Sequence, residues 1–156
     1  MKHHQYKLKI EWTGNNGNGT EKYDAYRRDF TIHFENKAPI FASADSIFRG
    51  DSSKLNPEEM LLSAISSCHM LWFLHECADH GIKLIEYTDT PEAVLEIIPG
   101  NGGRFTEATL TPEIVLESFD GKINIQELHE LAAKKCFIAN SCNFPIKINS
   151  QYRNRT

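Results

Sequence analysis

The sequence predicts an α+β fold with a mainly antiparallel sheet. Two segments, residues 57–80 and 125–135, carry apolar side chains at three- and four-residue steps, which is typical of helices. Shorter segments alternate apolar and polar residues, as half-buried strands do. These strand patterns follow one another in hairpins and do not alternate with helices, so a parallel βα sheet is not expected. We expect one domain, residues 1–156.

Composition narrows the class of protein. Of the 156 residues, 40% are hydrophobic and 24% are charged, as in an ordinary globular protein. The net charge is −4, and basic residues are not concentrated enough to indicate a nucleic-acid-binding surface. Arg153 and Arg155 are expected to form a solvated basic tail. No run of eighteen apolar residues predicts a membrane span. Because the N-terminus carries no apolar leader, we expect a cytoplasmic protein with reduced cysteines. They are Cys68, Cys77, Cys136 and Cys142.

The predicted strands have clear turn signals between them. They cover Tyr6–Trp12, Phe30–Phe34, Ile40–Ala42, Val94–Ile98, Phe105–Glu117 and Phe144–Ile148. The glycine-rich segment 14–19 is interpreted as a hairpin loop, because neither a Lys-Ser/Thr pair nor a helix follows it as a phosphate-binding loop would require. Residues 99–103 form a second turn, between two long strands.

The first helix has the strongest signals. Asn56 suits the N-cap, Pro57 the first helical position and Glu59 a capping box, and Gly81 suits the stop. From Pro57 to His80 it would be ~36 Å long. Its predicted inward residues are Met60, Leu61, Ala64, Ile65, Cys68, Leu71, Trp72 and His75. Because Met70 and Phe73 make the outward face apolar as well, the helix must be covered on nearly every side.

Cysteine in a core helix is usually inert packing. Two features favour reactivity at Cys68. Its neighbours Ser66, Ser67 and His69 are polar within an apolar helix, and Cys136 ends the second helical pattern, where the two helices could pack together. This combination favours thiol chemistry.

Other site classes are less well supported. Cys77 and Cys142 are interpreted as packing residues. The sequence has no closely spaced cysteine or histidine pairs of the kind that bind zinc, and no Gly-x-Ser-x-Gly elbow. A cysteine acyl-transfer enzyme with His69 or His129 as the base stays open.

Two motifs together resemble the OsmC/Ohr superfamily, which contains osmotically inducible protein C and the organic hydroperoxide resistance proteins. They are Asn-Pro-Glu-Glu-Met-Leu-Leu at 56–62, running on to Ser-Cys-His at 67–69, and Cys-Phe-Ile-Ala-Asn-Ser at 136–141. The resemblance covers nearly the whole chain in element order. The second motif departs from the Cys-Pro-x-Ser more usual in the peroxidases of the family. The resemblance implies an intertwined homodimer in which antiparallel sheets wrap around two long central helices.

The resemblance also implies roles for individual residues. Cys68 matches the peroxidatic cysteine, Cys136 the resolving cysteine and Glu58 the active-site glutamate. Spacing favours Arg49 as the family arginine, with Arg28 as the alternative. Because Glu58 and Cys68 are ten residues apart, ~15 Å on a straight helix, the carboxylate would act across a two-fold axis or through an arginine. Cys68 lies mid-helix and in apolar surroundings, so its activation requires an adjacent guanidinium.

The function expected from this resemblance is a thiol-dependent peroxidase of the oxidative stress response. It would reduce organic hydroperoxides to alcohols through a Cys68 sulfenic acid and a Cys68–Cys136 disulfide, which an external dithiol reduces. No metal or organic cofactor is expected, and no nucleic-acid or membrane partner. Apolar side chains favour bulky peroxides: Trp72, Phe73, Phe137 and Phe144. The alternative is a non-enzymatic ligand-binding or stress-response dimer of the same fold.

Overall fold

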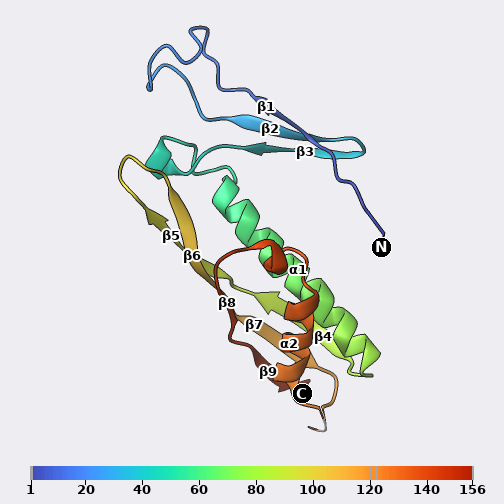
Figure 1. Cartoon of the computed structure of the whole chain (residues 1–156). Helices are drawn as coiled ribbons and strands as arrows, with labels where there is room; N and C mark the ends of the chain where they lie inside the picture. Colours follow the sequence, from blue (N-terminus) through green and yellow to red (C-terminus); the bar gives the residue numbers. More distant parts are fainter. Residues whose placement is uncertain (1, 120, 122, 156) are drawn as a thin grey trace. The chain divides into compact units, whose positions relative to one another are not determined.

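The computed structural model describes residues 2–119, 121 and 123–155 (Figure 1). Contacts within the chain define two compact units, one ending at Met60 and one beginning at Leu61. Helix α1 (Pro57–Asp79) begins in the first unit and continues in the second. The single domain over 1–156 stays a prediction.

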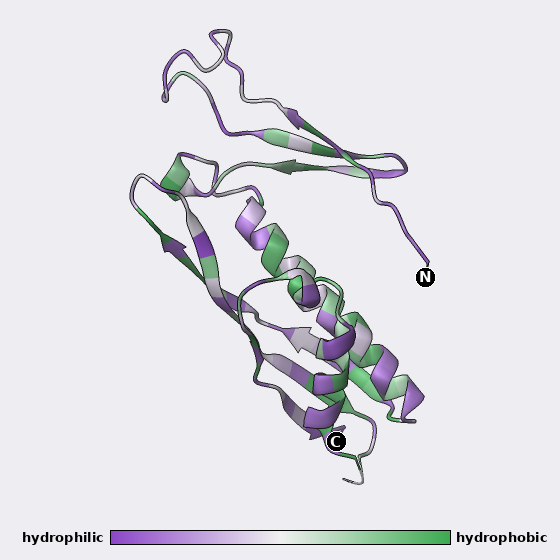
Figure 2. Ribbon diagram, in the orientation of Figure 1, coloured by the Kyte–Doolittle hydropathy of each residue, from purple (hydrophilic) through white to green (hydrophobic). Residues whose placement is uncertain are grey.

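The first unit is built on a three-stranded antiparallel sheet. Its strands are β1 (Lys9–Trp12), β2 (Phe30–Phe34) and β3 (Lys37–Ala42), in that order. The glycine-rich segment 14–19 lies in the connection between the antiparallel strands β1 and β2, which confirms the predicted hairpin. A short 3₁₀ helix, η1 (Ser46–Phe48), follows β3. Figure 2 shows apolar segments, in green, along the strands of this sheet, and many apolar side chains in the sheet or next to it are exposed to solvent. They include Leu8, Ile10, Trp12 and Phe41.

The start and the end of α1 are those that its sequence predicts. The Asn56 side-chain oxygen accepts the backbone N–H of Glu59 at 2.8 Å, and the Glu59 carboxylate accepts the N–H of Asn56 at 3.2 Å. This reciprocal capping box satisfies two N–H groups that no helical carbonyl can reach. At the other end Gly81 has φ +69°, the left-handed conformation that stops a helix at a glycine.

The buried face of α1 differs from the predicted one. Its fully buried residues are Ile65, His69, Phe73, Glu76 and Cys77. Phe73 was expected on the outward face and is wholly buried, whereas Leu71 was expected inward and is 61% exposed. The prediction was wrong because nearly every face of this helix is apolar, so periodicity alone cannot select the side that packs on the sheet.

The second unit contains two three-stranded sheets. One has the order β4 (Leu84–Asp89), β7 (Pro112–Leu116), β9 (Gln151–Asn154), and the other has the order β5 (Glu92–Ile97), β6 (Gly103–Leu110), β8 (Ile146–Ile148). The turn between β5 and β6 is the one predicted at residues 99–103. Strands β8 and β9 join β6 and β7 in parallel, so both sheets are mixed.

Two of these strands were not predicted. Partly buried and exposed residues alternate in β4 from Ile85 to Asp89, whereas β9 is exposed along its whole length. Arg153 is exposed to solvent, as predicted, but it lies in strand β9 at the edge of a sheet and not in an unpaired tail. Strand β9 pairs with β7 through backbone groups, and such pairing leaves no hydrophobic pattern in the sequence.

Helix α2 (Ile125–Lys135) completes the second unit and has the predicted bounds. Both helices pack on the same face of the sheet that contains β7 (Figure 1). The buried cluster between them contains residues of α1, α2 and β7: Phe73, Cys77, Ile114, Leu116, Ile125, Leu128 and Ala132. No helix among the residues that the structure describes has the length and the apolar character needed to cross a membrane.

Two buried polar contacts join α1 to α2 within this apolar cluster. The carboxylate of Glu76, 2% exposed, accepts the Lys135 ammonium at 2.6 Å. The His69 Nε2 and His129 Nδ1 atoms lie 3.0 Å apart in a hydrogen bond between two fully buried rings. Burial lowers the pKa of His69 to about 4, although the Asp89 carboxylate opposes the shift. Burial, and then the proximity of His69, lower the pKa of His129 to about 3.

Asp89 ties α1 to the sheet at the point where β4 ends. Its carboxylate accepts the Ser66 hydroxyl at 2.5 Å and the backbone N–H of Thr111 at 2.7 Å. Thr111 lies between β6 and β7. The Asp89 side chain therefore joins α1 to the place where β6 ends and β7 begins.

The Glu76–Lys135 pair predicts an asymmetric response to substitution. Lys135→Met leaves a buried carboxylate without its ammonium and should lower the free energy of unfolding by about 1–3 kcal/mol. Glu76→Met leaves a half-exposed ammonium that water can solvate, so it should cost less. Urea unfolding at pH 7 measures both values. An equal or larger loss in Glu76→Met would contradict this account of the pair.

The two histidines predict a loss of stability in acid. In the unfolded chain both imidazoles titrate near pH ~6.5, whereas in the folded chain they stay neutral until about pH 4 and about pH 3. The unfolded state therefore binds more protons, and the stability that the neutral pair contributes above pH ~6.5 declines as the pH falls toward 4. Urea unfolding from pH 7 to pH 4.5 should show a shallower decline in His129→Asn than in the wild type. If the free energy of unfolding declines equally with pH in both proteins, His129 does not contribute to the loss of stability in acid.

Candidate functional site

The structure brings Cys68 and Cys136 together. Cys68 lies in the middle of α1, and Cys136 is the C-cap residue of α2. Their side chains are close enough to interact, because Cys68 is one of the groups that raise the pKa of Cys136. Cys68 is partly exposed, whereas Cys136 is buried. The two thiols that the sequence singled out are therefore neighbours, and one is more accessible than the other.

The environment of Cys136 favours its protonated form. Burial and the nearby Cys68 side chain raise the pKa of Cys136 to about 11. Backbone N–H groups of the following turn act in the opposite direction, among them the N–H of Ala139, which donates to the Cys136 sulfur at 3.4 Å. Since burial outweighs these contacts, Cys136 is a thiol at neutral pH.

Aromatic side chains border the thiol pair. Trp72, one helical turn after Cys68, meets the ring of Phe137 edge-on at a centroid distance of 5.7 Å. Phe137 is 71% exposed, and the Lys135 ammonium lies 5.6 Å from the Trp72 ring. Phe73 was expected beside the thiols, but it lies in the core and stacks on His129 at 3.9 Å.

A small hollow of about 130 Å³ is lined by residues of both helices, β6, β8 and the turn after Cys136, and neither Cys68 nor Cys136 is among its lining residues. Its walls include His69, which follows Cys68, and Ala139, which contacts Cys136. The other lining residues are Ile65, Leu110, Ala133, Asn140, Phe144, Ile146 and Ile148. A hollow of this size accommodates a group about as large as benzene.

Glu58 and the two candidate arginines belong to the first unit. One carboxylate oxygen of Glu58, Oε2, is buried and has no hydrogen-bond partner among the described residues. The guanidinium of Arg28 lies 4.2 Å from the ring of Tyr23 and 4.3 Å from that of Tyr26, and it donates to the carbonyls of both at 2.7 Å. Arg49 lies 5.8 Å from the same Tyr23 ring, so both arginines approach one aromatic side chain.

Arg49 has an unusual backbone conformation. Its φ of +64° is left-handed, which is strained for a residue with a side chain. It caps η1, and the next residue, Gly50, passes so close to the Ala44 carbonyl that a Cβ on Gly50 would lie 1.6 Å from that oxygen. The tight turn therefore fixes the backbone from which the Arg49 side chain extends.

The remaining candidates lie away from the thiol pair or have other partners. Burial raises the pKa of Cys77 to about 11, and this residue is part of the core cluster. The Cys142 thiol donates to the Ile138 carbonyl at 3.3 Å. The Nε2 atom of His69 is occupied by His129, so the pair is a core contact between helices and not the free base that acyl transfer would need.

The sequence analysis missed three charged residues around this site: Glu76, Asp89 and Lys135. For two of them, the sequence does contain a feature that could have indicated their place at the site. Glu76 is an acidic residue two turns after Cys68 in an otherwise apolar stretch, and Lys135 directly precedes Cys136. Among the residues described, no three histidine, cysteine, aspartate or glutamate side chains converge in a way that would hold a metal ion.

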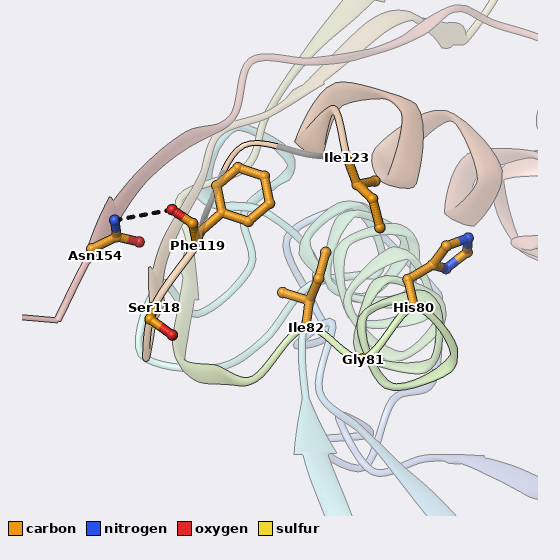
Figure 3. A pocket seen from close by; sticks show the side chains of 7 residues that line it. All are labelled: His80, Gly81, Ile82, Ser118, Phe119, Ile123 and Asn154. Atoms are coloured by element: carbon orange, nitrogen blue, oxygen red, sulfur yellow. Dashed lines mark hydrogen bonds between the residues drawn. The ribbon is translucent and has the colours of Figure 1, made fainter.

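The largest of the pockets described lies elsewhere, at the end of α1 (Figure 3). Its volume is about 430 Å³, and the Asn154 side chain donates to the Phe119 carbonyl at its edge, at 3.4 Å. Its lining residues are His80, Gly81, Ile82, Ser118, Phe119, Ile123 and Asn154. It contains no cysteine, so it offers nothing to thiol chemistry.

Comparisons with known proteins agree on the fold. An OsmC-like protein of unknown function from Vibrio cholerae is 26% identical, with a TM-score of 0.80 over 97% of this chain and all of the other. An organic hydroperoxide resistance protein from Elizabethkingia anophelis is 19% identical, with a TM-score of 0.66 over 99% of this chain and all of the other. The organic hydroperoxide resistance protein OhrB of Bacillus subtilis is 14% identical, with a TM-score of 0.57 over 95% and 98% of the two chains.

A search of curated proteins found no match to this sequence. The family model described as OsmC-like protein matches residues 50–151, well over half of the chain. This segment contains the cap of α1, the two neighbouring cysteines and the second unit as far as the start of β9. The chain belongs to the OsmC-like protein family.

Proposed function

We propose that the protein is a cysteine-based peroxidase that reduces organic hydroperoxides to alcohols. The observation that carries the proposal is the proximity of Cys68 and Cys136, which interact electrostatically and of which one is partly exposed and one buried. Similarity to organic hydroperoxide resistance proteins adds support at the level of the fold.

The difference in exposure between Cys68 and Cys136 indicates which thiol reacts first with the peroxide. Cys136 stays protonated at neutral pH, so the accessible Cys68, as a thiolate, is the nucleophile. The Cys68 sulfur attacks the terminal oxygen of the hydroperoxide. The O–O bond breaks, Cys68 becomes a sulfenic acid, and the alkoxide leaves and takes a proton to form the alcohol.

Cys136 then resolves the sulfenic acid. Its sulfur bonds to that of Cys68, and its proton leaves with the sulfenic hydroxyl as water. An external dithiol returns both residues to thiols and becomes a disulfide. The buried position of Cys136 beside Cys68 suits this step, because the resolving thiol needs no access to solvent.

We assign the activating charge to an arginine held by Glu58. The unpartnered Oε2 of Glu58 can accept a guanidinium, and Arg49 and Arg28 are the candidates. Arg49 is the better one, because Arg28 already donates to two carbonyls between two rings, whereas the Arg49 side chain is exposed. Within α1, Glu58 is ~15 Å from Cys68, so the carboxylate would serve the thiol of a second chain.

This arrangement requires a homodimer, and exposed apolar surface on each unit supports one. Leu71 and Leu74 on α1 and Phe137 beside the thiols are exposed in the second unit. The sheet of the first unit exposes several more apolar side chains (Figure 2). Apolar surface of this extent is typically covered by a partner.

The hollow lined by His69 and Ala139 supports a substrate class. Most of its lining side chains are aliphatic or aromatic, and its volume of about 130 Å³ suits a compact hydrocarbon group, such as a phenyl ring or a short branched chain. Hydrogen peroxide offers no such group, so organic hydroperoxides should be the better substrates.

The test is a thiol titration of the reduced protein after addition of cumene hydroperoxide. We expect two thiols per chain to disappear and one cumyl alcohol to form. Cys136→Ser should lose one thiol only and accumulate a Cys68 sulfenic acid, visible as a mass gain of one oxygen. Cys142→Ser is the matched control and should behave like the wild type. Unchanged thiol counts in the wild type would refute peroxidase activity and favour a ligand-binding dimer.

A further inference from the structure

The bond between His69 and His129 lies at the point where α2 is fixed to α1. His69 directly follows Cys68, and its Nε2 lies 3.0 Å from the Nδ1 of His129. His129 precedes Cys136 by seven residues, which is two helical turns or ~10 Å along α2. The hydrogen bond therefore joins α2 to α1 immediately beside one thiol and two turns before the other.

A directional contact matters here because, apart from the Glu76–Lys135 ion pair with its partly exposed ammonium, the contact between these helices is apolar. Phe73, Leu128 and Ala132 pack between the helices, and burial of such surface does not specify one register. A hydrogen bond does, since a shift of α2 would leave both imidazoles unpaired in an apolar environment.

The tolerance for such a shift is small. A disulfide requires the two Cα atoms to lie ~4.4–6.8 Å apart. Each residue of a helix advances ~1.5 Å. A slide of α2 by ~3 Å, the rise of two helical residues, would therefore exceed the whole ~2.4 Å width of that range.

Packing alone does not explain two histidines at this place. In either neutral tautomer of the pair one ring donates and the other accepts, and the Nε2 atom of His129 is left buried without a partner among the described residues. Two apolar side chains of similar size would fill the same space with no unpaired nitrogen. The polar pair therefore contributes something other than burial.

We propose that the His69–His129 hydrogen bond sets the position of α2 so that Cys136 meets Cys68, which makes both histidines positioning residues of the thiol pair. The inference deepens the proposed function, because it concerns the disulfide of the same reaction. It assigns no proton transfer to either imidazole.

Isosteric variants separate the hydrogen bond from the bulk of the side chain. His129→Asn keeps a polar atom where Nδ1 lies, and His129→Leu has the same size without it. His69→Gln keeps a polar atom where Nε2 lies, and His69→Met is its apolar match. All four variants remove the imidazole. If all of them weaken the Cys68–Cys136 disulfide equally, the cause is the loss of the ring and not the loss of the hydrogen bond.

The readout is the equilibrium constant for the Cys68–Cys136 disulfide in glutathione redox buffers, measured by alkylation and mass spectrometry. We expect it to fall about five- to tenfold in His129→Leu and His69→Met, as the loss of one net hydrogen bond implies. It should stay near the wild-type value in His129→Asn and His69→Gln. Equal constants in all proteins, or equal losses in the polar and apolar variants, would overturn the inference even if thermal stability changes.

A second readout does not involve oxidation. Phenylarsine oxide binds two adjacent thiols through one trivalent arsenic, so its affinity for the reduced protein reports the same proximity. Weaker binding in His129→Leu than in His129→Asn supports the inference, and equal binding contradicts it. Turnover of cumene hydroperoxide separates the two proposals. If the wild type consumes no peroxide, the proposed function is refuted. The disulfide equilibrium constants and phenylarsine oxide affinities of the variants, each relative to the wild type, still decide the role of the histidines.

Discussion

The position of α2 on α1 determines whether this protein has a dithiol site at all. Cys68 and Cys136 are separated by most of the second unit in sequence, and they meet because α2 packs across α1 on one face of the sheet that contains β7. The Glu76–Lys135 ion pair and the His69–His129 hydrogen bond join the two helices at separate places. The two imidazoles and the Glu76 carboxylate are buried, so each contact would be costly to break, and together with the apolar cluster they hold the thiols close together.

Local signals made much of the fold predictable from the sequence. Capping boxes, glycine stops and glycine-rich turns act over a few residues, and Asn56, Glu59 and Gly81 behave as their chemistry dictates. The face of α1 was not predictable, because Leu71 and Phe73 are equally apolar and only tertiary packing distinguishes them. Strand β9 was missed for a related reason: its pairing depends on the backbone, while its side chains are exposed.

At the candidate site, the sequence correctly indicated that two distant cysteines meet. The supporting polar residues could not be inferred. A buried carboxylate such as Glu76 is tolerated only beside a specific cation, and the sequence does not state that Lys135, fifty-nine residues away, provides it. The same holds for His69, whose neighbour in the sequence is the reactive cysteine but whose partner in space is His129. Glu58, Arg49 and Arg28 keep their assigned roles as predictions, since they lie in the other unit.

The parallel pairing of β8 and β9 has a consequence for how the second unit folds. Each joins a strand that lies more than thirty residues earlier, so the edge of each sheet closes only after a long loop has been ordered. The turn after Cys136 packs with Ile146 and Ile148 of the β8 edge. During synthesis on a ribosome, Cys68 would thus emerge and join a helix well before its partner sulfur has a fixed place. In that interval it would be open to exchange with small-molecule disulfides, which forms a mixed disulfide and releases a thiol.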